Sequence, residues 1–181
     1  MMWSKLKQRV EERFADSVGG RAAVHNARYR HSHNEYGRGW ITFDTHEIAD
    51  MSDSRQLRSL LRIEREIQVA NGTTNYLDPA QQPGYYAAIA QARETMHERG
   101  IYAKYEFNRA LWDSLSLSID DMLRSENGII RALAMLDRRV GKRRLLALDL
   151  PNDELPLVRT LYALRCEAEG IAVDATAAAV G

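Results

Sequence analysis

The chain has 181 residues, of which 45% are hydrophobic and 28% charged, and its 25 basic side chains balance 25 acidic ones. This composition is typical of a soluble globular protein, and no apolar run approaches the ~20 residues of a membrane-spanning helix. A formal net charge of zero argues against a dedicated nucleic-acid domain, which usually carries a positive excess. The single cysteine, Cys166, excludes an internal disulfide. Because the N-terminal segment also lacks the apolar stretch of a secretory signal, we expect a cytoplasmic protein.

A helix followed by a small antiparallel sheet is predicted at the N-terminus. Apolar residues recur at spacings of three and four over 3–18, which indicates an amphipathic helix that ends at the glycine pair 19–20. The following segments are rich in β-branched and aromatic residues or are bounded by turn residues. The two or three strands expected from them are 21–30, 39–43 and 47–51.

The remainder of the chain is predicted to be mostly helical, because apolar spacing of three and four alternates with glycine, proline and capping residues. The predicted helices are 54–70, 85–99, 105–115, 118–123, 128–140, 142–148 and 156–169. We therefore expect an α+β fold, in which a helix and sheet precede a helical bundle. The expected parts are 1–72 (helix, hairpin and connecting helix), 73–84 (linker loop), 85–170 (helical bundle) and 171–181 (flexible tail).

Two of these helices echo one another. Residues 129–136, IIRALAML, are followed 28 residues later by 157–164, LVRTLYAL, and each copy follows a polar turn. The pattern resembles the second helix of HEAT-type repeats, which implies two helical hairpins with contacting, buried faces. The period is shorter than the ~40 residues of a full unit, and neighbouring amphipathic helices can share such spacing without a repeat. Both explanations stay open. Burial is predicted for Ile129, Leu133, Leu136, Leu157, Leu161 and Leu164.

A second resemblance covers most of the chain. It rests on WSKLK at 3–7, FADS at 14–17, RYRHSH at 28–33, GRGWI at 37–41 and RALAMLDRRVGKRRL at 131–145. These segments resemble an uncharacterised family of small bacterial cytoplasmic proteins. The resemblance implies a bacterial, soluble protein and carries no activity or site residues with it.

Two basic stretches, 21–38 and 131–144, supply the candidate binding residues. In the first, Arg28, Arg30 and His31 surround Tyr29, a combination that can grip phosphate and stack a base. The alternative is a solvated strand face with the tyrosine turned inward. In the second, the cations either form a ligand-binding surface or pair with acids of a neighbouring helix, such as Glu167 or Glu169. The candidates there are Arg131, Arg138, Arg139, Lys142, Arg143 and Arg144.

No metal, cofactor or catalytic motif is predicted. His31 and His33 lie two residues apart and Glu35 or His25 would add a third ligand, but structural zinc needs four ligands and the nearby arginines would repel a dication. The chain has no glycine-rich phosphate loop and no serine in a nucleophile elbow.

The leading hypothesis is a non-catalytic cytoplasmic protein-interaction or adaptor protein, because repeated amphipathic helices form binding surfaces more often than reactive pockets. Its expected partner is another protein, and no membrane contact is expected. One alternative is an accessory nucleic-acid or nucleotide binder that uses 21–38 and 131–144. Another is an enzyme with an unrecognised site. The oligomeric state is left open.

Overall fold

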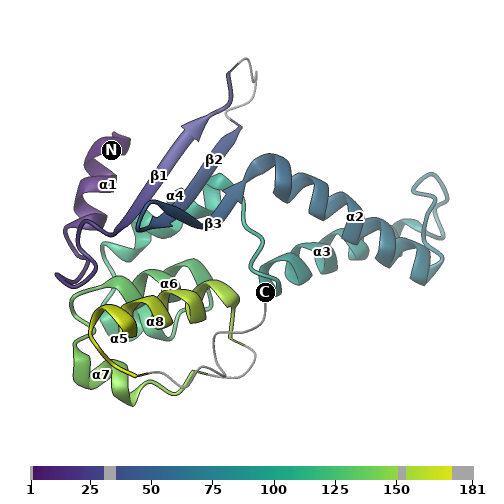
Figure 1. The fold of residues 1–181 in the computed structure, drawn as a ribbon. Coiled ribbons are helices and arrows are strands. Elements are labelled where there is room, and N and C mark those ends of the chain that lie inside the picture. The colour runs from purple at the N-terminus through teal and green to yellow at the C-terminus, as the bar shows by residue number, and fades with distance from the viewer. Residues whose placement is uncertain (1, 31–35, 151–153, 173–181) are drawn as a thin grey trace.

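The computed structural model describes residues 2–30, 36–150 and 154–172, and it confirms the α+β class. A helix and a sheet lie beside a helical group, and a helical arm projects from them (Figure 1). The strands are β1 (Ala22–Arg28), β2 (Gly37–Phe43) and β3 (His46–Ser52). The helices are α1 (Trp3–Glu11), α2 (Asp53–Asn71), α3 (Gln82–Glu98), α4 (Lys104–Ser114), α5 (Ile119–Leu123), α6 (Gly128–Leu136), α7 (Lys142–Ala147) and α8 (Pro156–Ala168).

The three strands form one antiparallel sheet in the order β1-β2-β3. Burial alternates along β2, as expected when one face of a strand is covered. Helices α1 and α4 contact the sheet on that face. Gly39 lets α4 approach closely, since a Cβ at this position would lie 2.3 Å from a ring carbon of Phe107.

The first helix is shorter than predicted. It ends at Glu11, and the apolar spacing that continues to Val18 belongs to a turn. Phe14 pairs with Asp137 in an isolated β-bridge, and the backbone N–H of Ala15 donates to the carbonyl of Leu136 at 2.8 Å. Contacts with α6, distant in the sequence, therefore end a helix that local spacing alone would continue.

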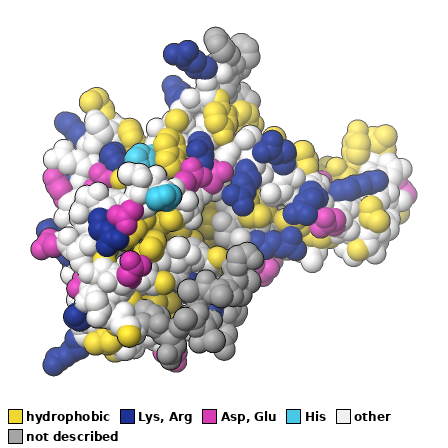
Figure 2. All heavy atoms as spheres, viewed as in Figure 1, with side chains coloured by type: hydrophobic (Ala, Val, Ile, Leu, Met, Phe, Trp, Pro, Cys, Tyr) yellow, Lys and Arg dark blue, Asp and Glu magenta, His cyan; other side chains and the backbone are white. Residues whose placement is uncertain are grey.

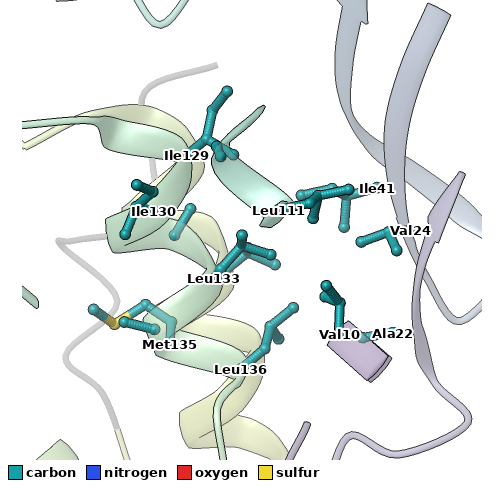
Figure 3. Packing of buried hydrophobic residues seen from close by; sticks show 14 of the residues in the cluster. Val10, Ala22, Val24, Ile41, Leu111, Ile129, Ile130, Leu133, Met135 and Leu136 are labelled. Atoms are coloured by element: carbon teal, nitrogen blue, oxygen red, sulfur yellow. The ribbon is translucent and has the colours of Figure 1, made fainter. Parts of the chain in front are cut away.

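Helix α6 lies at the centre of the main core, and eight of its nine residues are buried. In Figure 3, Leu133 of α6 points toward Leu111 of α4 and Val10 of α1, with Ile41 of the sheet close by. Helices α4, α5 and α8 all contact α6. The helix is apolar almost all round, which is the pattern expected of a helix surrounded by others.

The echoed helices α6 and α8 contact each other, as predicted. Ile129, Leu133, Leu136 and Leu161 are buried, whereas Leu157 and Leu164 are only partly buried. Helix α8 instead turns Val158, Leu161 and Arg165 inward, because it covers the core from one side only. Helix α6 also ends at Leu136 rather than near residue 140, since Asp137 is extended and its carboxylate accepts the backbone N–H of Arg139.

Helices α2 and α3 form the projecting arm (Figure 1). The hydroxyl of Ser52 caps the start of α2, and Gly72 ends it with a left-handed backbone at φ 67°. Alanines at 88 and 92 face α2 and allow the two helices to approach, so the arm has a small core of its own around Ile63. The predicted linker 73–84 lies at the tip of this arm and includes the first turn of α3.

Within the described residues, no helix combines the length and apolarity that crossing a membrane requires. Of the predicted tail 171–181, residues 173–181 lie outside the described part of the chain.

Candidate functional site at the base of the arm

The first basic stretch is partly engaged in structural contacts. Arg28 and Arg30 lie at the end of β1, whereas His31, with the predicted ligands His33 and Glu35, falls outside the described residues. The hydroxyl of Tyr29 is 2.7 Å from that of Ser52, so this end of β1 is tied to the start of α2.

Two further arginines of this stretch are paired. Arg21 binds Asp44 through two hydrogen bonds, and Arg38 binds Asp50 at 2.8 Å. His25 stacks on Trp40 at 4.9 Å between ring centroids, and burial followed by the charge of Lys7 lowers its pKa. Among the described residues, no group of three or more histidines, cysteines or acids is placed to hold a metal ion.

Most cations of the second stretch hold neighbouring elements together. Arg131 binds Glu154 at 2.7 Å, Arg139 binds Asp137 at 2.7 Å, and Arg144 binds Asp120 at 2.5 Å. The ammonium of Lys142 donates to the carbonyl of Glu169 at the end of α8. Arg138 and Arg143 are exposed, and their side chains make no hydrogen bond or ion pair with the described residues.

The structure does not bring Arg28 and Arg30 of the first stretch together with the candidate residues of the second. Arg28 and Arg30 lie at the far end of β1, and the helices that carry 131–144 lie at the opposite end of the molecule (Figure 1). A single basic surface built from both sets is therefore not formed by the described residues.

A cleft opens where the arm joins the body. Its volume is about 310 Å³, at the lower end of the range for small-ligand sites. The residues that line it come from the end of α3, from α4 and from the turn before α6. They are His97, Tyr102, Tyr105, Glu106, Arg109, Glu126 and Asn127.

One wall of the cleft is a fixed network of polar and aromatic groups. The Nε2 of His97 lies 2.7 Å from Oε1 of Glu106, and because a carboxylate only accepts, the imidazole N–H donates. Oε2 of Glu106 accepts the backbone N–H of Ala103 at 2.7 Å, so the carboxylate also caps α4. The ring of His97 stacks on that of Tyr102 with centroids 5.4 Å apart. Each group is held by its neighbour, which leaves this wall rigid.

The opposite wall is the start of α6. Oδ1 of Asn127 accepts the backbone N–H of Ile129 at 2.9 Å and so caps the helix. The backbone of Gly128 packs against Tyr102 and Leu155, where a Cβ would lie 2.8 Å from the tyrosine hydroxyl and 2.0 Å from a leucine methyl. Burial raises the pKa of Tyr102, although a hydrogen bond from the Gly128 backbone acts in the other direction. Its hydroxyl therefore stays protonated and serves packing.

Along the rim of the cleft, α4 presents an exposed face of three large side chains, of which Tyr105 and Arg109 also line the cleft. Tyr105, Arg109 and Trp112 follow one another at spacings of four and three, which places them on one side of the helix. Tyr105 is 70% exposed and Trp112 is 46% exposed. Arg109 lies between them and pairs with Asp113 at 2.8 Å. We call Tyr105, Arg109 and Trp112 the α4 face.

Two exposed leucines lie on α2, the helix that starts beside Tyr105. The backbone N–H of Lys104 donates to Asp53 at 2.9 Å, so Tyr105, the next residue, lies beside the start of α2. Leu57 and Leu61 follow Asp53 by one and two helical turns and are both exposed. Exposed apolar side chains are thus present both on α4 and on the part of α2 nearest the body.

The polar groups of the cleft are those of hydrogen bonding. Among the described residues that line it, His97 and Glu106 form a hydrogen-bonded pair, and none is a serine, threonine, cysteine or lysine. Cys166 lies elsewhere in the core, where burial raises the pKa of its thiol and suppresses the reactive thiolate.

Sequence reasoning missed the cleft and the α4 face. His97 and Glu106 fall in two separate predicted helices, 85–99 and 105–115, and their contact depends on the turn at Gly100 between those helices. The density of histidine, tyrosine and arginine over 97–112 is the one signal that could have drawn attention to this segment.

The chain belongs to the SF0329 protein family, whose model matches residues 2–166. The matched region includes the sheet, the arm, the cleft and most of α8. No match was found among curated proteins or among solved structures.

Proposed function

We propose that the protein is a non-catalytic cytoplasmic interaction protein that binds a partner protein at the base of its arm. The observation that carries the proposal is the composition of the α4 face. Tyrosine, arginine and tryptophan are the residue types enriched among the side chains that contribute most to protein–protein affinity. Here all three are exposed on one side of one helix, beside a preformed cleft.

The surroundings of the α4 face support a partner with both apolar and polar groups. Leu57 and Leu61 extend the apolar area onto the arm, and His97, Glu106 and Glu126 supply donors and acceptors within the cleft. A central apolar cluster with a polar rim is the usual arrangement of a specific protein interface. The contacts between α4, α6 and the sheet provide a rigid support for it.

The resemblances noted in the sequence fit this proposal. A bacterial origin and a cytoplasmic location follow from the whole-chain resemblance, and α5–α6 with α7–α8 would be its two HEAT-like hairpins. In this reading the hairpins are the support that holds α4, since α6 packs on α4 and α8 packs on α6.

The two alternatives have less support. A nucleic-acid or nucleotide site on 21–38 and 131–144 would have to use cations that mostly pair with carboxylates or carbonyls of the protein itself. An enzyme would have to work through the pair His97 and Glu106 without an adjacent nucleophile.

A site-specific crosslinking experiment tests the proposal. A photoreactive phenylalanine analogue replaces Tyr105, and in a control chain it replaces Leu146, an exposed apolar residue of α7. In bacterial cells that express the protein, position 105 should capture one defined protein that position 146 does not. The partner is then purified, and its affinity is measured by calorimetry for the wild type and for Tyr105→Ala, Trp112→Ala and Leu146→Ala.

We expect each aromatic substitution to weaken binding at least about tenfold, as loss of a central interface aromatic does, and Leu146→Ala to leave it unchanged. Equal capture at both positions, or an affinity unchanged by Tyr105→Ala and Trp112→Ala in chains that keep their circular dichroism, would refute a protein site at the α4 face. Crosslinking of position 105 to nucleic acid would contradict a protein partner at the α4 face and favour the nucleic-acid alternative.

A further inference from the structure

Helix α2 carries a row of four arginines that faces away from α3. Arg55, Arg58, Arg62 and Arg65 follow one another at spacings of three, four and three. At 100° per residue they occupy an arc of about 80°, and at 1.5 Å per residue they extend over about 15 Å. The core side of α2, marked by Ile63, lies on another side of the helix. We call these four residues the arginine face.

The arginine face is exposed and only weakly paired. The side chains of Arg55 and Arg62 are 58% and 63% exposed, and their nearest carboxylates, Asp50 and Glu66, lie 3.9 Å and 3.8 Å away. Arg58 and Arg65 are exposed and form no ion pair with the described residues. In the stretch 131–144, by contrast, carboxylates hold three arginines at 2.5–2.7 Å. Guanidinium groups on α2 thus remain available to a partner.

The composition of the face indicates a polyanion. From Ser54 to Glu66, this side of α2 presents only serine, arginine and glutamate, whereas the centre of a protein interface is depleted of charge. Of the exposed leucines of the arm, Leu61 adjoins this row, because it follows Arg58 by three residues and precedes Arg65 by four. The array of guanidinium groups matches the regularly spaced phosphates of a nucleic-acid backbone.

The end of β1 lies near the start of the same helix. The Tyr29 hydroxyl lies 3.4 Å from that of Ser54, which brings the backbone that carries Arg28 and Arg30 close to the start of α2. In Figure 2, dark blue side chains run along the arm and reappear at the exposed end of the sheet, on one side of the molecule. The carboxylates on this side are few. Glu47 and Asp50 pair with Arg38, and Glu66 lies by Arg62.

We propose that the arginine face binds the phosphodiester backbone of nucleic acid without reading its sequence. Arg55, Arg58, Arg62 and Arg65 each contact a phosphate, and Arg28 and Arg30 guide the strand at the near end of the arm. This site shares none of its arginines with the α4 face, so substitutions at the two sites test the two proposals separately. If both sites operate, the chain connects a protein to a nucleic acid.

The test is fluorescence anisotropy with the full chain and two labelled probes, a 20-nucleotide single strand and a 20-base-pair duplex of mixed sequence. Binding should appear at low salt. For about four phosphate contacts, the logarithm of the association constant should fall with the logarithm of salt concentration with a slope between about −3 and −4. Comparison of the two probes shows which form of nucleic acid the face prefers.

Three double variants, each removing two positive charges, locate the site. Arg58→Gln with Arg62→Gln should weaken binding about tenfold or more and reduce the salt slope by about two. Arg9→Gln with Arg124→Gln, both exposed and outside the arm, should change affinity less than about twofold. The third variant, Arg138→Gln with Arg143→Gln, tests whether the stretch 131–144 contributes to binding of the probes. All variants should keep the circular dichroism and melting temperature of the wild type.

Several results would overturn the proposal. They are no binding of either probe at low salt, an equal loss in the Arg9/Arg124 variant, or a loss only in the Arg138/Arg143 variant. Unlabelled poly-glutamate that displaces the probe at equal charge concentration would also overturn it, because the face would then recognise acidic polypeptides rather than phosphates.

Discussion

Substitution of Arg165 is the strongest test of the contacts that join α8 to the end of α6. Its side chain is 2% exposed and lies between α8 and the segment that leaves α6. It donates to the carbonyl of Leu136 at 3.2 Å, to the carbonyl of Val140 at 3.1 Å and to Glu169 at 2.9 Å. A buried guanidinium thus replaces the hydrogen bonds that the end of α6 cannot make within the helix.

Arg165→Met keeps a long side chain of similar reach and removes all three donors. The carbonyl of Leu136 retains the N–H of Ala15, whereas the carbonyl of Val140 loses the partner that the structure shows. A buried carbonyl without a partner costs about 1–3 kcal/mol, and the lost hydrogen bond to Glu169 costs a further ~1.5–3 kcal/mol. After a partial offset from the apolar methionine, we expect the free energy of unfolding to fall by about 3–5 kcal/mol.

Urea unfolding followed by far-UV circular dichroism at pH 7 measures this change. Arg143→Met is the matched control, because Arg143 is exposed and should alter stability by less than about 0.5 kcal/mol. A loss below about 1 kcal/mol for Arg165→Met would show that water or a shifted backbone satisfies the two carbonyls, and that the arginine is not what joins α8 to α6.

Four further outcomes are expected. Leu133→Ala should lower the free energy of unfolding by about 2–5 kcal/mol in the same assay, because it opens a cavity at the centre of the core. Gly39→Ala should cost about 1–3 kcal/mol, since its Cβ would lie 2.3 Å from an aromatic ring of α4; an unchanged midpoint would contradict this contact. The hydroxyl of Ser17 and the neighbouring guanidinium hold the pKa of Glu169 below its ordinary value of 4.5. That stabilisation is present above pH 4.5 and disappears as pH falls through the lower folded-state pKa, so Glu169→Gln should flatten the acid limb of stability against pH. Finally, Cys166 should react with a disulfide reagent only as fast as the protein opens, because its thiol is buried and its pKa is raised; rapid native labelling would contradict this.

The types of the elements follow from local sequence. Spacings of three and four predict every helix after β3, and the glycines at 72, 100 and 170 end helices with a left-handed backbone, as expected. Strand β2 follows from its β-branched and aromatic residues, and β1 and β3 follow from the turn residues that bound them. These signals are local because a helix or strand buries one side, and the apolar residues of that side recur in the sequence with the period of the element.

The ends of some helices required the tertiary structure. Apolar spacing continues past Glu11 in α1 and past Leu136 in α6, yet both helices end there. The ends meet in space, and the bridge between Phe14 and Asp137 satisfies backbone groups that a longer helix would have satisfied internally. Two termini that stabilise each other across more than a hundred residues leave no local signal.

By itself, the sequence determined an α+β chain with an N-terminal helix, an antiparallel sheet of two or three strands and a helical remainder, and it identified the two basic stretches. Only the tertiary structure decided which charges are paired. Arginine-rich segments of similar composition hold cations paired with acids in 131–144 and exposed, weakly paired cations on α2. The cleft at the base of the arm likewise depends on the approach of α3, α4 and the start of α6. Whether an arginine forms an ion pair, and whether a cleft is enclosed, depends on distances between segments that are remote in the sequence. The packing of the whole core sets those distances.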